Sequence, residues 1–282
     1  MTAQLIRGPV VEKSIKEEII QEVRKIKEYT GKCPGLSIIL VGDNPVSRVS
    51  AAEKEKIAGE LGFFSVVNNY PATITQEELI AVIEGQNNDE RIHAIRVQLP
   101  LPDYLDEHRV IKAVDPEKDV DGLHPVNIGN LILSEGDTYI PIAPLACLKL
   151  FQHIQYDLNG KHAIVMGRSN IMGKPMSVLL LKENATVTLC HSRTSNLSEI
   201  CRMADVLVVA IGRPHLVKKE WIKPGAVVID VGLNRVGDKV LGDVDYEEVS
   251  EAAGFITPPG DVGAITDTMF MLNTLESFKK TL

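Results

Sequence analysis

The sequence predicts an α/β protein with two α/β domains, of which the second is a Rossmann-like nucleotide-binding domain, and a cleft between the two. Short apolar runs alternate with stretches of helical spacing, which is typical of parallel α/β sheets. A glycine-containing turn, Gly167 to Gly173, follows the apolar run at residues 163–166. Two later apolar runs, residues 206–210 and 226–230, also end near a glycine, where open α/β sheets bind ligands.

The elements follow in order from these patterns. Helices are predicted at residues 10–30, from 45 to about 62, after the capping box Thr75–Glu78, after Gly173 and from residue 266 onwards. Strands are predicted at residues 36–41, 63–68, 93–97, 163–166, 186–190, 206–210 and 226–230. Prolines at residues 141–144 indicate a junction, and the last helix is expected to pack on the first domain. The predicted domains are therefore residues 1–140 with 264–282, and residues 141–263.

Composition limits the class of protein. The 282 residues have 44% hydrophobic and 24% charged content and a net charge of −8, which argues against a broad nucleic-acid or anionic-membrane surface. The four cysteines are scattered without a C-x-x-C pattern, which favours reduced structural thiols in a cytoplasmic protein. Neither a signal-peptide core nor a bilayer-length apolar run is seen, and we expect no membrane partner.

Three residues of the first domain are candidates for chemistry. Lys54 shares a helix face with Ser50, and a buried lysine can transfer protons. Gln98 could orient that lysine, and Asp121 could hold a donor-rich heterocycle by paired hydrogen bonds. Taken singly, spacing favours the plainer interpretation of a solvated lysine, a turn glutamine and a loop aspartate. No His/Asp/Glu cluster has metal-ligand spacing, so no metal is expected.

The turn of the second domain reads Gly167-x-Ser169-x-x-x-Gly173 in place of the usual G-x-G-x-x-G. Amide groups at the start of the following helix favour a phosphate, and Arg168 adds a positive charge. A strand, turn and helix without a ligand would look much the same, so this signal is weak alone. The next strand ends before Ser192 and Arg193 with no acid, which favours NADP over NAD; the alternative is a solvated loop.

These residues resemble the bifunctional methylenetetrahydrofolate dehydrogenase/methenyltetrahydrofolate cyclohydrolase family, often called FolD, over nearly the whole chain. The motifs that carry the resemblance are VGDNP at 41–45, VQLPLP at 97–102, KDVDGLHP at 118–125, GRS at 167–169, GKPM at 173–176, CHSRT at 190–194, DVG at 230–232 and GDV at 242–244. Their order and spacing make a chance match very improbable.

The resemblance implies hydride transfer from methylenetetrahydrofolate to NADP, then addition of water to the methenyl product to give formyltetrahydrofolate. It implies that Lys54 manages proton transfer, that Gln98 supports it and that Asp121 grips the pterin ring. The positions that match NADP contacts are Gly167, Arg168, Ser169, Ser192 and Leu233. Members of the family are usually homodimers packed through the nucleotide domain.

The chain departs from the family pattern around the folate half. Ser50 stands where the family has a tyrosine that stacks on the folate, and Arg96 replaces an apolar residue next to Gln98. In residues 141–146 a threonine and a glycine of the family pattern are lost. The loop at residues 257–266 lacks one residue. In that loop Asp261 replaces a glycine and Ala264 replaces a proline, and the candidate substrate contacts include Pro259, Gly260 and Asp261.

Two hypotheses follow. The first is an NADP-dependent methylenetetrahydrofolate dehydrogenase; its cyclohydrolase step, which needs accurate proton handling, is the more exposed to damage by Ser50, and both an impaired and an intact second activity stay open. The second is a family-derived protein that binds NADP but has a changed substrate or no folate catalysis, which the added charges of Arg96 and Asp261 motivate. Thermal stabilisation by NADP with folate supports the first, and stabilisation by NADP alone supports the second.

Overall fold

The computed structural model describes residues 3–136, 138–237 and 239–282, and the chain divides into two compact units. The first, called here the six-stranded unit, comprises the amino-terminal segment up to Lys13 and residues Ala143–Thr266. The second, the three-stranded unit, comprises Ser14–Ile142 and Asp267–Leu282. Each contains a parallel sheet with helices, which confirms the predicted α/β class.

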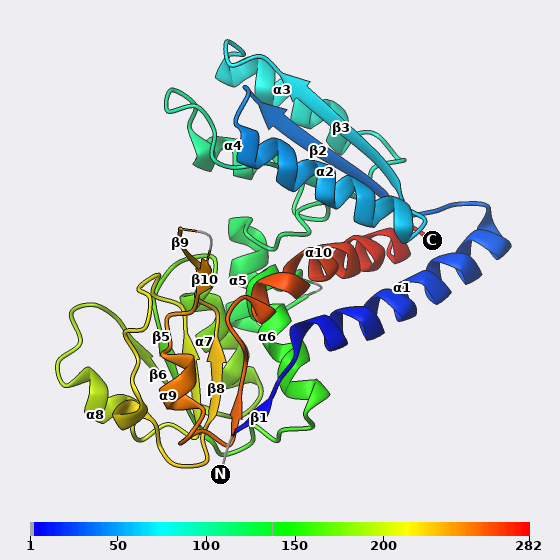
Figure 1. Ribbon diagram of the computed structural model, residues 1–282. Coiled ribbons are helices and arrows are strands. Elements are labelled where there is room, and N and C mark those ends of the chain that lie inside the picture. Colours follow the sequence, from blue (N-terminus) through cyan, green and yellow to red (C-terminus); the bar gives the residue numbers. More distant parts are fainter. Residues whose placement is uncertain (1–2, 137, 238) are drawn as a thin grey trace. The chain divides into compact units, whose positions relative to one another are not determined.

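The six-stranded unit has a fully parallel sheet in the order β1-β11-β8-β7-β5-β6 (Figure 1). Its strands are β1 Gln4–Leu5, β5 His162–Met166, β6 Thr186–Cys190, β7 Val206–Val209, β8 Val227–Asp230 and β11 Phe255–Ile256. The other elements are α6 Ile142–His153, α7 Gly173–Lys182, α8 Leu197–Cys201, η1 Lys219–Trp221, α9 Tyr246–Val249 and the antiparallel pair β9 Asn234–Val236 and β10 Lys239–Leu241. All four residues of both β7 and β8 are buried, as expected for strands covered on both faces.

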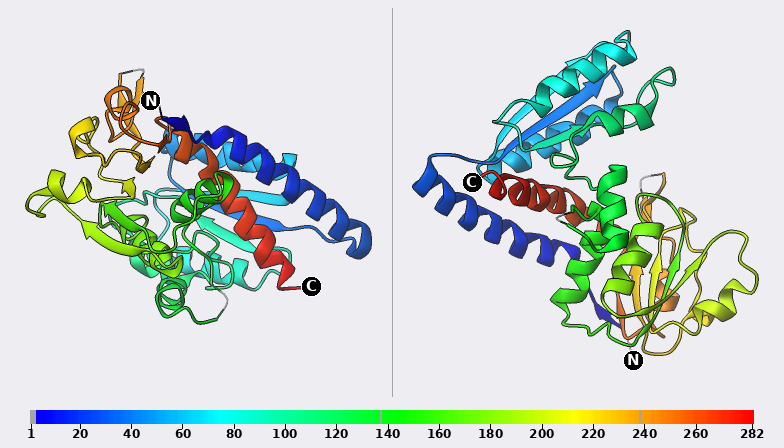
Figure 2. Two further views of the ribbon diagram at one scale, coloured as in Figure 1. Left: turned by 90° about the horizontal axis from the view of Figure 1, so that it is seen from below. Right: turned by 180° about the vertical axis from the view of Figure 1, so that it is seen from behind.

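The three-stranded unit has the parallel order β3-β2-β4. Its strands are β2 Gly35–Val41, β3 Phe64–Tyr70 and β4 Ala94–Val97, and its helices are α2 Pro45–Glu60, α3 Gln76–Asn87, α4 Glu107–Ala113 and α5 Pro125–Leu133. Helix α2 packs on β2 and β3, and α3 and α4 lie on the opposite face of the sheet (Figure 2). That arrangement follows from right-handed crossovers running in opposite directions from β2 to β3 and from β3 to β4.

Two long helices cross the division between the units. Helix α1 is Gly8–Thr30 and α10 is Asp261–Lys279. We expected residues 1–13 in the first domain; the structure groups them with the six-stranded unit, because β1 pairs with β11 at Gln4 and Phe255. Helix α10 begins at Asp261 and not at residue 266, since the amide of Ala264 already bonds to the Gly260 carbonyl at 3.0 Å.

The predicted strands agree with the structure to within two residues at each end, and the Thr75–Glu78 capping box is present. Helices α4, α5, α6, α8 and α9 were not predicted, and neither were the strands β1, β9, β10 and β11, each of two or three residues. No helix in the described part of the chain is long and apolar enough to span a bilayer.

Candidate active site

Parallel pairing brings the two predicted phosphate-contacting segments to one edge of the six-stranded sheet. Strands β5 and β6 pair in register with Met166 opposite Cys190, and the Gly167 amide donates to the Cys190 carbonyl at 3.0 Å. The segments that follow, Gly167–Ser169 and His191–Thr194, therefore both leave the carboxyl edge of the sheet, where α/β proteins bind ligands.

The glycines of the first turn are required by close backbone contacts. Gly167 has φ +120°, and a Cβ there would lie 2.1 Å from the carbonyl oxygen of Ala210. A Cβ on Gly173 would lie 1.9 Å from the carbonyl oxygen of Gly167. Any side chain at either position would push α7 or β7 away from this turn. The turn thus holds the start of α7 against the sheet edge.

The start of α7 has few free amides, because the Lys174 amide donates to the Ser169 carbonyl at 3.1 Å, the Met176 amide donates to the Met172 carbonyl at 2.8 Å, and Pro175 has no amide hydrogen. The N-cap residue of α7, Met172, makes no side-chain capping bond. The Ser169 hydroxyl lies 3.5 Å from the Gly173 amide, and the side chain of Arg168 is exposed beside it. The partial positive charge at a helix start, together with a hydroxyl and a guanidinium, suits a phosphate.

The second turn presents a serine and an arginine to solvent. The His191 amide donates to the Thr194 hydroxyl at 2.9 Å, and the Arg193 amide donates to His191 Nδ1 at 3.1 Å. These bonds employ His191 and Thr194 within the turn and leave the side chains of Ser192 and Arg193 exposed. A guanidinium and a hydroxyl on one tight turn form a suitable site for a ribose phosphate.

Two buried carboxylates brace the loops at this edge, and the sequence patterns assigned neither a role. Asp230 accepts the amides of Gly232 at 2.9 Å and Val244 at 3.0 Å, and burial raises its pKa to about 7. Asp243 accepts the amides of Ile211 at 2.7 Å and of Gly212 and Arg213 at 2.9 and 2.8 Å. The motifs DVG and GDV contain these two aspartates and could have marked them. Their bracing role was not predictable, because each carboxylate bonds to a loop that is distant in sequence.

The predicted substrate contacts in the 257–266 loop have two different surroundings in the structure. Gly260 has φ +85°, and a Cβ there would lie 3.8 Å from the exposed Leu233 side chain, so Pro259 and Gly260 adjoin that candidate cofactor contact. The carboxylate of Asp261 instead accepts from Arg7 Nε at 3.2 Å and from the Gly8 amide at 3.0 Å. The structure therefore gives Asp261 a bond to the amino-terminal segment at the start of α10.

The three-stranded unit buries the amine of Lys54. Its side chain, on α2, is 4% exposed. The Nζ atom donates to the Ser50 hydroxyl at 2.9 Å and pairs with Asp267 Oδ1 at 2.8 Å, while the Ser50 carbonyl lies farther away at 3.5 Å. Ser50 and Lys54 do share a helix face, as the spacing predicts.

A second ion pair lies nearby in the same unit. Arg96 on β4 bonds to Asp121 Oδ1 at 2.5 Å, and its guanidinium carbon sits 5.2 Å from the centre of the Phe270 ring. Burial raises the pKa of Asp121, while the positive charges of Arg96 and Lys54 oppose that rise and the negative charge of Asp267 adds to it. The two pairs therefore interact, and we call Lys54, Asp267, Arg96 and Asp121 the charge cluster.

Gln98 follows β4 but is not bonded to the charge cluster within the described residues. Its Nε2 donates to the Leu99 carbonyl at 3.2 Å, and its Oε1 is buried without a partner there. Such an unpaired acceptor is costly unless a ligand or water completes it. Gln98 thus offers an acceptor to a bound molecule, and its predicted support of Lys54 stays a prediction.

Sequence reasoning missed Asp267 and Phe270. Both lie on α10, where an aspartate between apolar residues is typical of a solvated helix face. Only the folded chain shows that Asp267 reaches Lys54, 213 positions earlier in the numbering. Among described residues, no group of three or more His, Cys, Asp or Glu side chains is arranged to hold a metal ion.

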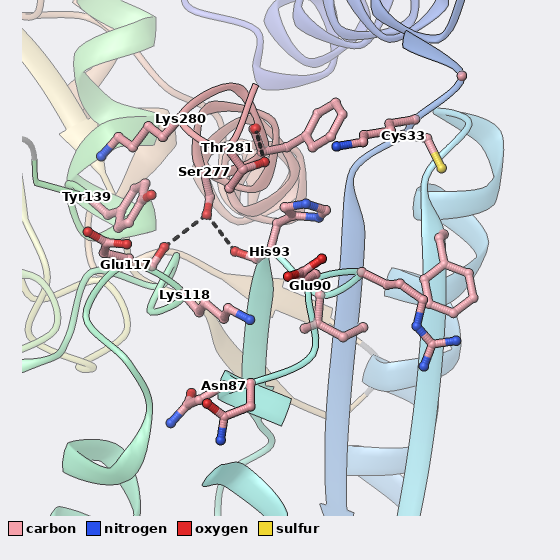
Figure 3. Close-up of a pocket in the computed structure, with 17 residues that line it drawn as sticks. Cys33, Asn87, Glu90, His93, Glu117, Lys118, Tyr139, Ser277, Lys280 and Thr281 are labelled. Carbon is pink, nitrogen blue, oxygen red and sulfur yellow. Dashed lines mark hydrogen bonds between the residues drawn. The ribbon is translucent and has the colours of Figure 1, made fainter. Parts of the chain in front are cut away.

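A hollow in the three-stranded unit lies apart from the predicted site residues (Figure 3). The Ser277 hydroxyl in it donates to the carbonyls of His93 at 2.6 Å and Glu117 at 2.9 Å, and Lys118 Nζ donates to the Asp89 carbonyl at 2.9 Å. Those polar groups tie the end of α10 to the sheet. We therefore place the candidate chemistry at the charge cluster and not in this hollow.

A parallel sheet, a glycine turn that leads from the carboxyl end of an interior strand into a helix, and braced loops at the same edge define a nucleotide-binding α/β protein. The sequence matches two protein-family models. The tetrahydrofolate dehydrogenase/cyclohydrolase catalytic domain matches residues 6–121, and the NAD(P)-binding domain of the same proteins matches residues 141–282. The chain belongs to the tetrahydrofolate dehydrogenase/cyclohydrolase family, as the motifs predicted.

Individual relatives agree over almost their whole length. The bifunctional protein FolD of Enterococcus faecalis is 49% identical over 278 residues, which cover 98% of each chain. The structure of the bifunctional enzyme FolD from Campylobacter jejuni has a TM-score of 0.96 at 41% identity and covers 99% of this chain and 100% of that one. A Trypanosoma brucei methylenetetrahydrofolate dehydrogenase-cyclohydrolase, solved with NADP and an inhibitor, has a TM-score of 0.93 at 38% identity, covering 100% of this chain and 99% of that one.

Proposed function

We propose that this protein is an NADP-dependent methylenetetrahydrofolate dehydrogenase that also carries methenyltetrahydrofolate cyclohydrolase activity. The observation that carries the proposal is the buried amine of Lys54, held by Ser50 and Asp267 in the unit that also contains Asp121. A buried lysine beside carboxylates is suited to proton handling. Family membership and near-complete coverage of bifunctional relatives support both activities.

The six-stranded unit would hold NADP. A Cβ on Gly167 would meet the Ala210 carbonyl, so the glycine keeps this turn tight against the sheet edge, where Arg168 and Ser169 precede α7. Ser192 and Arg193 would take the 2′-phosphate. Leu233, exposed beside the 257–266 loop, would cover an apolar part of the cofactor. When bound, NADP supplies the acceptor for a hydride, and the chain supplies its position.

The three-stranded unit would hold the folate. Arg96 occupies one oxygen of Asp121, so the second oxygen is the one we assign to donor groups of the pterin ring. The unpaired Oε1 of Gln98 would accept a further hydrogen from the bound molecule. Lys54 would manage the proton released when water adds to the methenyl carbon and the ring C–N bond opens to the formyl product.

Pro259 and Gly260 are proposed as substrate contacts on the family resemblance; within the six-stranded unit, Gly260 lies near Leu233. We assign Asp261 a weaker role there, since its carboxylate already bonds to Arg7 and Gly8. The three-stranded unit would be the folate domain and the six-stranded unit the NADP domain, so residues 3–13 and 264–266, which we expected in the folate domain, fall in the NADP domain. A homodimer in the cytoplasm is proposed on the family resemblance alone.

The test is one assay on the purified protein. Methylenetetrahydrofolate and NADP are mixed with it, and NADPH and the methenyl intermediate are followed together. We expect NADPH to rise in both versions of the function; accumulation of methenyl then indicates an impaired cyclohydrolase, and its absence indicates two intact activities. No NADPH would contradict the proposal.

The Arg96–Asp121 pair favours one alternative, an NADP-binding protein with a changed substrate or without folate catalysis. A carboxylate already engaged by a guanidinium is a poorer partner for a neutral pterin. Thermal unfolding separates the two. If NADP raises the melting temperature and added tetrahydrofolate raises it no further, the alternative is supported.

A further inference from the structure

A lysine ammonium has three N–H groups, and their partners here are unequal. Two are held at short distance, by the Ser50 hydroxyl at 2.9 Å and by Asp267 Oδ1 at 2.8 Å. The third acceptor, the Ser50 carbonyl, lies at 3.5 Å, at the limit of a hydrogen bond. Two strong contacts therefore fix the direction of the amine, and its third N–H is the one available to a reacting group.

Of the two close partners of the Lys54 amine, only Asp267 lies on a different helix from Lys54. Ser50 belongs to the same helix as Lys54, whereas Asp267 lies on α10. That helix is fastened beside Asp121, because Asn273 Nδ2 donates to the carbonyls of Val120 at 2.8 Å and Ile140 at 3.1 Å. Asp267 therefore sets the amine of Lys54 relative to the loop that carries Asp121.

Helix α10 supports both ion pairs of the charge cluster. Asp267 and Phe270 are three residues apart and so share a helix face. Asp267 pairs with Lys54, and the ring of Phe270 lies under the guanidinium of Arg96. The cluster holds two positive and two negative groups, and removal of one carboxylate would leave a buried ammonium without its nearest counter-charge.

We propose that Asp267 is a positioning residue for Lys54: its carboxylate holds the ammonium at the angle from which the third N–H serves the proton transfer of the folate reactions. The role of Lys54 rests on the proposed function, while the pairing itself does not. The groups that face Lys54 are Asp267 from α10, Ser50 from α2 and, through the field of the cluster, Asp121 with its partner Arg96.

The experiment compares Asp267→Asn, Asp267→Glu and the control Glu276→Gln, which removes an exposed carboxylate farther along the same helix. Hydrolysis of methenyltetrahydrofolate is measured without NADP, so that the proton step is read alone. We expect Asp267→Asn to lower kcat by about 10- to 100-fold with KM within about threefold, and to alter its pH profile. Asp267→Glu should recover part of kcat, and Glu276→Gln should match the parent.

Two results would overturn the positioning role. One is an Asp267→Asn variant with kcat within about twofold of the parent. The other is a parallel loss of kcat, of substrate affinity and of NADP-dependent thermal stabilisation, which would indicate a merely structural residue. Failure of the proposed function is distinct, because the parent protein itself would then hydrolyse no methenyltetrahydrofolate.

A second measurement keeps the pairing testable in that event. Unfolding is followed for Lys54→Met, Asp267→Asn and the double variant. Lys54→Met changes the folding equilibrium constant by some factor, and we expect that factor to differ by at least about fivefold between the parent protein and the Asp267→Asn variant. Equal effects would show that Asp267 does not hold Lys54, and the inference would be wrong.

Discussion

The two units build their candidate sites by different means. In the six-stranded unit the site is mainly backbone. A Cβ added to Gly167 would lie 2.1 Å from a carbonyl oxygen, and one added to Gly173 would lie 1.9 Å from another, so both positions require glycine. In the three-stranded unit the site is side chains, with two ion pairs collected from a helix, a strand, a loop and α10. A backbone site has few acceptable replacements, whereas a balanced group of charges can be exchanged in pairs.

This difference accounts for two of the departures from the family pattern, Ser50 and Arg96. The nucleotide-type turn keeps the family motif, while Ser50 and Arg96 are altered around the charge cluster. A small Ser50 still accepts a bond from Lys54, and the added charge of Arg96 is balanced by Asp121. The comparison therefore predicts strong local effects of glycine substitution in one unit and charge-dependent effects in the other.

The largest expected effect is on Lys54. Lys54→Met should lower the cyclohydrolase kcat by about 100-fold or more, because general acid–base groups contribute roughly that factor. NADP-dependent thermal stabilisation should be unchanged, since the cofactor contacts belong to the six-stranded unit. Initial rates with methenyltetrahydrofolate and melting curves with NADP measure both. If Lys54→Met also abolished the thermal stabilisation by NADP, the NADP site and the site around Lys54 would not be independent, which would contradict this comparison.

Gly167→Ala tests the backbone site. The new Cβ would meet the Ala210 carbonyl and hold an unfavourable φ of +120°, so we expect the free energy of unfolding to fall by about 3 kcal/mol and NADP binding to be lost. The matched control is Gly160→Ala, where φ is +72° but nothing lies within 4 Å of the Cβ. Its cost should be about 1 kcal/mol with NADP binding intact. Denaturant unfolding and NADP titration would show either outcome.

A buried carboxylate in each unit gives a pH test. Burial raises the pKa of Asp119 from 3.8 to about 7, so the folded state holds the proton more tightly and the stability falls as pH rises from about 4 to 7. Asp119 receives the His124 amide and the Asn127 side chain on one oxygen, Oδ2, which an asparagine can reproduce. Asp119→Asn should therefore be more stable than the parent at pH 8 by about 2–4 kcal/mol and similar below pH 4.

The matched substitution in the other unit is Asp230→Asn. The pKa of Asp230 is also raised to about 7, but its two oxygens accept three backbone amides, and an asparagine NH₂ would face one of them. We expect Asp230→Asn to be destabilised at every pH. Denaturant unfolding at pH 4 and pH 8 measures both variants; a gain in stability of Asp230→Asn would contradict the bonding described.

A smaller effect is expected at Arg193. Arg193→Ala should raise the KM for NADP about tenfold and leave the KM for NAD unchanged, because only NADP carries the 2′-phosphate. Lys182→Ala, at the far end of α7, removes an exposed cation for comparison. Equal losses with both cofactors would show that this turn does not select NADP.

The smallest effect is the return of an aromatic ring at Ser50. Ser50→Tyr should improve folate turnover by a few-fold to about tenfold, since stacking of a ring contributes about 0.5–1.5 kcal/mol. The measurement is kcat/KM for methylenetetrahydrofolate. If turnover does not rise at all, Asp267 and the small serine are a complete substitute for the family tyrosine, and our interpretation of position 50 is wrong.

The sequence alone determined the α/β class, the strands β2 to β8, the glycine turn and the family. These depend on local signals: apolar runs, helical spacing and contiguous motifs, in which each residue acts through near neighbours. The shared helix face of Lys54 and Ser50 also belongs to this group, because a spacing of four residues places them on one side of the helix.

Only the tertiary structure decided the partners of the charged groups. From the sequence, Arg96 was an unexplained charge in a strand, Asp261 was a candidate substrate contact and Asp267 had no role. The structure pairs Arg96 with Asp121, Asp261 with Arg7 and Asp267 with Lys54. The amino-terminal strand likewise found its place only by pairing with β11. The physical reason is that an ion pair depends on distance in space, which spacing along the chain fixes within one helix or strand but not between elements far apart.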